Sequence, residues 1–354
     1  MGKKTFNINN LVRAHIINLK PYSSARDEYT GREGVFLDAN ENPFGSVTNE
    51  PFNRYPDPLQ KEVKQILAEL KGVQAEQIFL GNGSDEAIDL LFRAFCEPKL
   101  DKVLTMPPTY GMYQVSADIN LVEAVQVPLN PDFSINTDAV LKQIAQDNTF
   151  KMLFICSPNN PSGNQMAQED IELILQNFSG LIIVDEAYID FAPKPSLAKL
   201  LPEYPNLVVL QTFSKAWGMA ALRMGMAFAN KEIIHIINKI KPPYNINQLT
   251  QSKVLEALKA DAQRQQKVEE ILELRKALIK DLETLRIVKK VYPSDANFLL
   301  VKVKNAHKTY QELVKQLVIV RDRSKVLLCE DCLRITVGTE EENTKLIEAL
   351  KKLQ

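Results

Sequence analysis

Two charged side chains directly follow apolar segments that are typical of buried strands. Lys215 comes shortly after residues 207–211, and Asp185 follows residues 181–184, which are all apolar. A lysine amine forms an imine with an aldehyde when its pKa is lowered and water is limited. A carboxylate at a buried strand end is costly unless it meets a cation, such as a protonated pyridine nitrogen. Each residue also has a plainer interpretation, a solvated loop lysine or a carboxylate that caps the next segment. The hypothesis of such a site therefore rests on the two together.

A phosphate could bind close to the same strand ends. Gly83, Ser84 and Asp85 lie between an apolar strand and an apolar helix. Free amides at the start of a helix, together with its dipole, bind phosphate. The plainer alternative is that Ser84 or Asp85 caps the helix. Ser214 and Arg223, which lies eight positions after the lysine, would add a hydroxyl and a guanidinium.

Two further polar side chains could complete a binding site. Asn160 lies in a Pro-rich loop after the strand expected at residues 151–156, where open α/β sheets place their ligands. Its amide could donate to a cofactor oxygen, although the loop could also be a simple turn. Arg334 lies in an apolar strand and offers a guanidinium fork for a carboxylate or phosphate. Alternatively, its stem packs along the sheet and its head reaches solvent.

Strands and helices alternate from about residue 74 to residue 230. The expected strands are residues 78–80, 102–105, 122–127, 151–156, 181–184, 207–211 and 225–229. Several are apolar at nearly every position, which indicates strands buried on both faces of a largely parallel sheet. Helices between such strands predict an α/β layered architecture.

The pattern changes after about residue 248, which predicts a second, α+β domain. A charged amphipathic stretch runs to about residue 285, and strands are expected at residues 296–303, 318–321 and 333–337. Helices are expected at residues 307–316 and from residue 340 to the end, and a short one near residues 10–17. We therefore expect an N-terminal arm over residues 1–30 that joins the small domain, a large domain over residues 31–247 and a small domain over residues 248–354.

Composition excludes several classes of partner. The 43 basic and 44 acidic residues give a net charge of −1, so we expect no nucleic-acid or membrane partner. No apolar run is long enough to span a bilayer, and the N-terminus lacks the apolar core of a signal peptide, so we expect a cytoplasmic protein. Cys329 and Cys332 form a C-x-x-C pair without a second pair nearby, so no metal site is expected.

The motifs, taken in order, resemble those of fold-type I aminotransferases, which depend on pyridoxal 5′-phosphate (PLP). They are Gly-Ser-Asp, Asn-Asn-Pro-Ser-Gly, Asp-x-Ala-Tyr, Ser-Lys with an arginine eight positions later, and Leu-Arg-Ile. Residues 20–22, 37–45, 54–58, 320–323 and 333–339 are similar to the histidinol-phosphate aminotransferases within that family. The resemblance implies a large domain with a mixed, mostly parallel seven-stranded sheet and a smaller α+β domain.

The resemblance also implies roles for individual residues. Lys215 would hold PLP as a Schiff base and later move the proton between substrate and cofactor, and Asp185 would keep the pyridine nitrogen protonated. The other implied cofactor residues are Asn160 and Tyr188 at the phenolic oxygen, Tyr110 on the ring, Gly83, Ser84, Asp85, Ser214 and Arg223 at the phosphate, and Tyr55 from the partner subunit of a homodimer. The implied substrate residues are Tyr22, Asn40, Arg321 and Arg334.

The implied reaction transfers an amino group from L-histidinol phosphate to 2-oxoglutarate, giving imidazole-acetol phosphate and L-glutamate, in histidine biosynthesis. The two arginines could serve both substrates because a guanidinium fork matches a phosphate or a carboxylate. The closest alternative is another enzyme of the superfamily: an aromatic or broad-specificity aminotransferase, or a decarboxylase of a phosphorylated amino acid.

Two alternatives from other classes are less well supported. A PLP-fold ligand-sensing regulator would need a DNA-binding module, for which the aminotransferase-like segments, beginning by about residue 20, leave no room. A plain α/β phosphate-binding protein would not explain Lys215 and Asp185 together.

Overall fold

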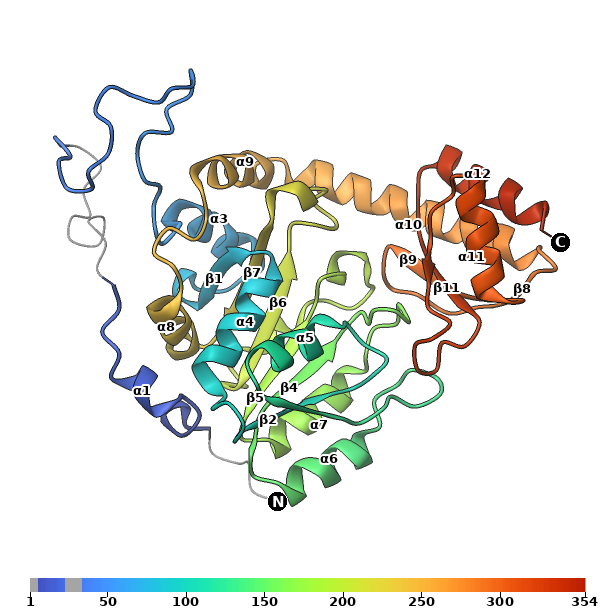
Figure 1. The fold of residues 1–354 in the computed structure, drawn as a ribbon, viewed down its shortest axis with the longest axis horizontal. Helices are drawn as coiled ribbons and strands as arrows, with labels where there is room; N and C mark the ends of the chain where they lie inside the picture. The colour runs from blue at the N-terminus through green and yellow to red at the C-terminus, as the bar shows by residue number, and fades with distance from the viewer. Residues whose placement is uncertain (1–5, 23–33, 354) are drawn as a thin grey trace.

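Seven strands form the large sheet, in the order β1-β7-β6-β5-β4-β2-β3 (Figure 1). The computed structural model describes residues 6–22 and 34–353. The strands are β1 (Ile78–Asn82), β2 (Lys102–Thr105), β3 (Glu123–Gln126), β4 (Phe150–Cys156), β5 (Leu181–Asp185), β6 (Leu207–Thr212) and β7 (Met224–Ala229). In this sheet β7 runs antiparallel to its two neighbours and the other pairs are parallel. The expected mixed, mostly parallel sheet is confirmed.

Helices cover both faces of the large sheet because its central strands are apolar at nearly every position. In β5, Ile182 and Val184 enter one core, whereas Leu181 and Ile183 enter the other, as the two-residue period of a strand requires. The first core contains side chains of α3 (Lys61–Lys71), α6 (Thr137–Gln146), α7 (Gln168–Asn177) and α9 (Gln248–Leu258). The second contains side chains of α1 (Ala14–Ile17), α4 (Ser84–Phe95), α5 (Met112–Ile119) and α8 (Lys231–Ile240).

The second sheet is antiparallel and has the order β10-β11-β9-β8. Its strands are β8 (Val288–Val291), β9 (Phe298–Val303), β10 (Arg321–Asp322) and β11 (Cys332–Thr336). Leu333 and Ile335 face a core that includes residues of α10 (Asp261–Glu283), α11 (Ala306–Lys315) and α12 (Glu340–Lys351). Cys332 faces the opposite way and joins the core of the large sheet. Figure 1 shows α10 running from the large sheet's side of the molecule to this smaller sheet.

Two elements of the small sheet differ from expectation. The prediction of a strand at residues 318–321 is wrong, because residues 317 and 318 still belong to the turn that ends α11. Leu317 has a φ of 59°, and the amide of Val318 donates to the carbonyl of Leu313. Only Arg321 and Asp322 pair with β11. Strand β8 was not expected, because two central lysines hide the apolar signal of this edge strand.

The described part of the N-terminal arm packs on the large sheet's layers and not on the small domain. Its apolar side chains, including Ile8 and Ile16, lie in the same core as α4 and α8. Arg13 pairs with Glu97 at 3.0 Å, and the Nζ of Lys239 donates to the carbonyl of Ile16. The expected attachment to the small domain is therefore not seen in residues 6–22, because apolar burial holds them elsewhere. The expected join near residue 30 lies outside the described residues, and the division near residue 247 stays a prediction.

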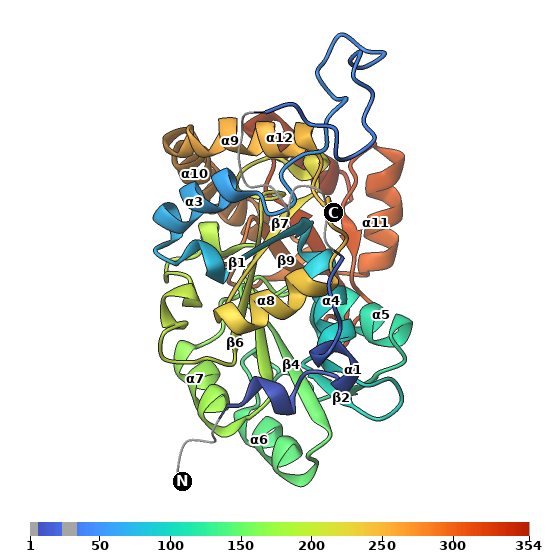
Figure 2. The same cartoon turned by 90° about the vertical axis from the view of Figure 1, so that its left-hand side faces the viewer.

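Residues 34–56 extend away from the rest of the subunit, as both views show (Figures 1 and 2). Their apolar side chains are largely exposed, with Phe44 at 96% and Val47 at 104% of full exposure. Among the described residues, no helix is long and apolar enough to cross a membrane.

Candidate functional site

A cavity of about 150 Å³ lies where β1, β4, β5 and β6 end. The parallel direction of these strands brings their carboxyl ends to one edge of the sheet, which is the usual ligand position in α/β folds. The described residues that line it are Gly83, Ser84, Asp85, Tyr110, Cys156, Asn160, Asp185, Ala187, Tyr188, Thr212, Ser214, Lys215, Ala220 and Arg223. Except for Tyr55, every residue expected to contact the cofactor lies in this cavity.

One end of the cavity presents free backbone amides. Helix α4 begins at Ser84, and no side chain caps it. Gly83 has a φ of 75°, and a Cβ there would lie 2.7 Å from the Nη2 of Arg223. A Cβ at Gly225 would lie 2.2 Å from the amide nitrogen of Ser84. Only glycines allow this close approach. Neither Ser84 nor Asp85 caps α4 with its side chain, so the alternative that they serve only as helix caps does not hold. The Arg223 guanidinium, 3.6 Å from the Asp85 carboxylate, adds positive charge at this end of the cavity.

Asp185 is a buried acid at the floor of the cavity. It accepts hydrogen bonds from the Tyr113 hydroxyl at 2.8 Å and from the amide of Ala187 at 3.1 Å. Burial raises its pKa to about 6, against the effect of these bonds. A cation placed beside it would favour the ionised form.

Lys215 follows β6, and its Nζ lies 5.6 Å from the centre of the Tyr188 ring. Desolvation lowers its pKa first, and the neighbouring Arg334 lowers it further. A lowered pKa increases the neutral, nucleophilic fraction of an amine. The environment of this lysine therefore suits imine formation, unlike that of a fully solvated loop lysine.

Asn160 connects the cavity to the small sheet. Its Oδ1 accepts a 2.5 Å hydrogen bond from the Nη1 of Arg334, whose guanidinium lies 5.3 Å from the ring centre of Phe298. The Asn160 amide nitrogen makes no hydrogen bond to the described residues, so it remains available as a donor. Arg321 lies directly across the strand pair from Arg334.

Besides Arg321 and Arg334, which do not line the cavity, three residues expected at the site lie elsewhere in this subunit. Tyr22 is 74% exposed. Asn40 and Tyr55 line a separate hollow of about 600 Å³, where Tyr55 stacks on Tyr244 with ring centres 4.4 Å apart. Among the described residues of one subunit, none of these three side chains lines the cavity that contains Lys215.

Sequence reasoning missed Tyr113, whose hydroxyl donates a hydrogen bond to the Asp185 carboxylate. Its position three residues after Tyr110 was the available signal, because a turn before α5 brings the amide of Tyr113 to 3.4 Å from the carbonyl of Tyr110. The two rings are in fact edge to face, 5.6 Å apart. Cys156 and Thr212 also line the cavity, and their places directly at strand ends were the available signal.

Glu186, next to Asp185, is a second buried acid. Its carboxylate accepts hydrogen bonds from Ser196, Leu197 and Gln211. Burial nevertheless raises its pKa from 4.5 to about 7. The folded state then binds a proton more tightly than the unfolded state does. The contribution of protonated Glu186 to the free energy of unfolding is therefore fully present below pH 4.5, and it is lost as pH rises to about 7.

We expect Glu186→Gln to remove this pH dependence. The free energy of unfolding of the wild type, relative to the variant, should fall by on the order of 3 kcal/mol between pH 4.5 and pH 7.5. Urea unfolding at several pH values measures this difference, with Glu203→Gln, at an exposed position, as the control. Parallel pH profiles for wild type and Glu186→Gln would contradict the assignment.

The chain belongs to the class I and II aminotransferase family, whose model matches residues 33–350. It is 56% identical over 346 residues to the histidinol-phosphate aminotransferase of Cytophaga hutchinsonii, covering 98% of this chain and 99% of that protein. It is 53% identical to the histidinol-phosphate aminotransferase of Bacteroides thetaiotaomicron, covering 97% of this chain and 98% of that protein.

Solved structures agree with the fold. The histidinol-phosphate aminotransferase of Clostridium acetobutylicum superposes with a TM-score of 0.79 at 26% identity, covering 85% of this chain and 91% of that one. The enzyme of Sinorhizobium meliloti, solved with PLP, has a TM-score of 0.76 at 22% identity, covering 89% of both chains. The expected fold class is confirmed.

Proposed function

We propose that the protein catalyses PLP-dependent transamination from L-histidinol phosphate to 2-oxoglutarate, a step of histidine biosynthesis. The observation that carries the proposal is the gathering of Lys215, Asp185 and the uncapped start of α4 in one cavity. The names of the relatives, over nearly the whole chain, support the substrate. We also propose a cytoplasmic location, in keeping with small, water-soluble substrates.

The residues of the cavity fit PLP at each of its polar groups. The α4 amides with Ser84, Ser214 and Arg223 would hold its phosphate, and Asp185 would pair with its pyridine nitrogen. The Asn160 amide and the Tyr188 hydroxyl would donate to its phenolic oxygen, and the Tyr110 ring would cover its face. Bound there, PLP supplies an aldehyde and an electron sink.

Lys215 has two tasks in this proposal. Its amine would hold the cofactor through the aldehyde until the substrate amine took its place. The freed amine would then accept the proton of the substrate α-carbon and return a proton to the cofactor carbon that bore the aldehyde. The lowered pKa of Lys215 suits a general base, because the neutral form must be populated near neutral pH.

Arg334 and Arg321 would bind the anionic end of each substrate. They lie opposite each other on neighbouring strands, and Arg334 reaches the cavity through Asn160. A guanidinium fork binds a phosphate ester or a carboxylate equally well in geometry. The same pair can therefore serve histidinol phosphate in one half of the reaction and 2-oxoglutarate in the other.

We further propose a homodimer in which residues 34–56 pack on the partner. Exposed apolar surface of this extent is typical of an interface. Tyr55 and Asn40 lie on this segment, so a dimer could bring them to the partner's cavity, and Tyr22 would complete the substrate pocket.

Introducing charge into this segment should weaken the dimer. We expect Val47→Asp combined with Phe44→Asp to shift the protein towards monomer and to reduce activity, because two charges would be buried in an apolar contact. Sedimentation equilibrium at micromolar concentration measures the shift, and Leu317→Asp, at another exposed apolar position, is the control. A wild type that sediments as a monomer would contradict the dimer.

Steady-state rates with histidinol phosphate, phenylalanine and threonine phosphate test the substrate. We expect the highest kcat/KM with histidinol phosphate and 2-oxoglutarate as acceptor. A higher value with phenylalanine would favour an aromatic aminotransferase. Release of carbon dioxide from threonine phosphate would favour a decarboxylase.

A further inference from the structure

A third arginine, Arg323, lies on the same face of the small sheet as Arg321 and Arg334. Arg321 and Arg334 are direct partners in the antiparallel pair of β10 and β11, so their side chains share a face. The amide of Arg323 donates to the carbonyl of Cys332 at 2.9 Å and so continues the ladder. Side chains two positions apart in an extended chain point the same way, which places Arg323 beside Arg321.

The charges of these arginines act on one another and on the cavity. Arg323 is half-buried; desolvation lowers its pKa, and the positive charge of Arg321 lowers it further. Desolvation also lowers the pKa of Arg334, and Arg323 is its next largest influence. The charge of Arg323 also reaches Tyr188, a residue of the cavity wall. The three guanidiniums therefore form one strongly positive region at the edge of the cavity.

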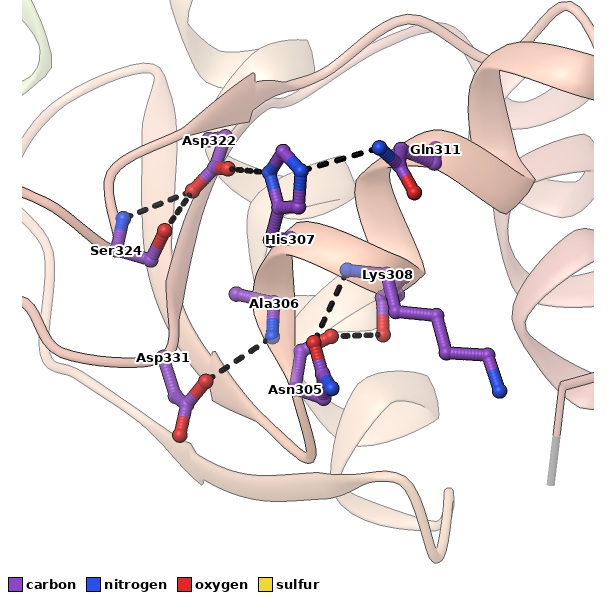
Figure 3. A network of polar contacts seen from close by, with 9 residues as sticks. Asn305, Ala306, His307, Lys308, Gln311, Asp322, Ser324 and Asp331 are labelled. Atoms are coloured by element: carbon purple, nitrogen blue, oxygen red, sulfur yellow. Dashed lines mark hydrogen bonds and ion pairs between the residues drawn. The ribbon is translucent and has the colours of Figure 1, made fainter.

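The nearest carboxylate in the sequence is directed away from this region. Asp322, between Arg321 and Arg323, points to the opposite face of the sheet, towards α11 (Figure 3). Its Oδ2 lies 3.0 Å from the Nδ1 of His307, and its Oδ1 accepts from the amide and hydroxyl of Ser324 at 2.8 and 2.6 Å. His307 is also 3.0 Å from the side-chain nitrogen of Gln311. These polar contacts hold the short strand β10 against α11.

The negative charge of Asp322 still raises the pKa of Arg323 from the opposite face, but this carboxylate pairs with His307 and not with an arginine. Among the described residues, no carboxylate forms an ion pair with Arg321, Arg323 or Arg334. Three clustered guanidiniums repel one another, and such a cluster is stabilised by a ligand with more than one negative charge. A phosphate monoester carries about −1.5 to −2 charges near pH 7 and three acceptor oxygens, whereas a carboxylate carries a single charge and two oxygens.

We infer that Arg323 is a third ligand for the phosphate of the amine substrate and favours it over the carboxylate of the co-substrate. The inference rests on the proposed function, since it assigns specificity within the same site. The His307–Asp322 contact positions Arg323 by holding β10 and by keeping the Asp322 carboxylate out of an ion pair with Arg323.

The test compares Arg323→Gln with Lys308→Gln in the holoenzyme. Lys308 is an exposed cation of the same domain, and its side chain points away from the network (Figure 3). We expect Arg323→Gln to lower kcat/KM for histidinol phosphate by about 10- to 100-fold, the size of a lost charge-assisted hydrogen bond. The kcat/KM for 2-oxoglutarate and for histidinol without its phosphate should change less than about 3-fold. Arg323→Lys, which keeps the charge but not the fork, should recover part of the loss.

Binding of inorganic phosphate to the same holoenzymes separates this inference from the proposed function. The cofactor fills its own phosphate site there, so calorimetric titration reports the substrate site. We expect weaker binding by Arg323→Gln than by wild type or Lys308→Gln. Equal phosphate affinities, or equal kcat/KM values for histidinol phosphate in the two variants, would overturn the role of Arg323. A wild type that binds phosphate through Arg323 but does not transaminate histidinol phosphate would instead overturn the proposed function alone.

Discussion

Lys215→Ala will abolish transamination and remove the visible absorbance of the bound cofactor. In the proposed function, the lysine amine both attaches the aldehyde and transfers the proton at the α-carbon. Loss of the proton transfer alone costs about 10²- to 10⁴-fold in rate. The measurements are an absorbance spectrum of the purified protein and a single-turnover rate with histidinol phosphate.

The matched control for this variant is Lys194→Ala, which removes an exposed lysine outside the cavity. It should keep both the absorbance and the rate. A Lys215→Ala protein with wild-type absorbance and turnover would show that the imine forms elsewhere or not at all.

Asp185→Asn should retain the fold but lose most of the activity. The carboxylate is buried and its pKa is raised to about 6, so its ionised form needs a cation beside it. In the proposed function this cation is the pyridine nitrogen of PLP, which a neutral amide would not keep protonated, so the ring would accept electrons poorly. We expect a fall in kcat of about 10²- to 10³-fold, comparable to the loss of a preorganised electrostatic contact elsewhere.

Tyr113→Phe serves as a milder variant against which the effect of Asp185→Asn is compared. It removes the 2.8 Å hydrogen bond to the carboxylate but leaves the charge in place. The fall in kcat should be about 10-fold or less, the usual net value of one hydrogen bond. If Asp185→Asn were no more harmful than Tyr113→Phe, the carboxylate charge would not be what the site uses.

The cavity could be predicted from the sequence because its residues are tied locally to strand ends. Asp185 ends β5, and Asn160 and Lys215 closely follow β4 and β6. Once the strands are recognised as parallel, their ends must share one edge of the sheet. The local sequence therefore predicts both the strand and the polar side chain that follows its end.

Features that depend on packing between distant segments could not be predicted in this way. The bond from Tyr113 to Asp185 requires the position of α5 over the sheet. The His307–Asp322 contact requires the register of β10 on β11 and the placement of α11 beside it. The place of the described part of the N-terminal arm depends in the same way on its burial against α4 and α8.

The most direct test of the proposed reaction is a half-reaction without an acceptor. Histidinol phosphate is mixed with the holoenzyme, and visible absorbance and products are followed with no 2-oxoglutarate present. The account predicts loss of the absorbance together with one equivalent of imidazole-acetol phosphate per active site, and recovery of the absorbance when 2-oxoglutarate is added. An unchanged spectrum, or release of carbon dioxide in place of the keto product, would contradict it.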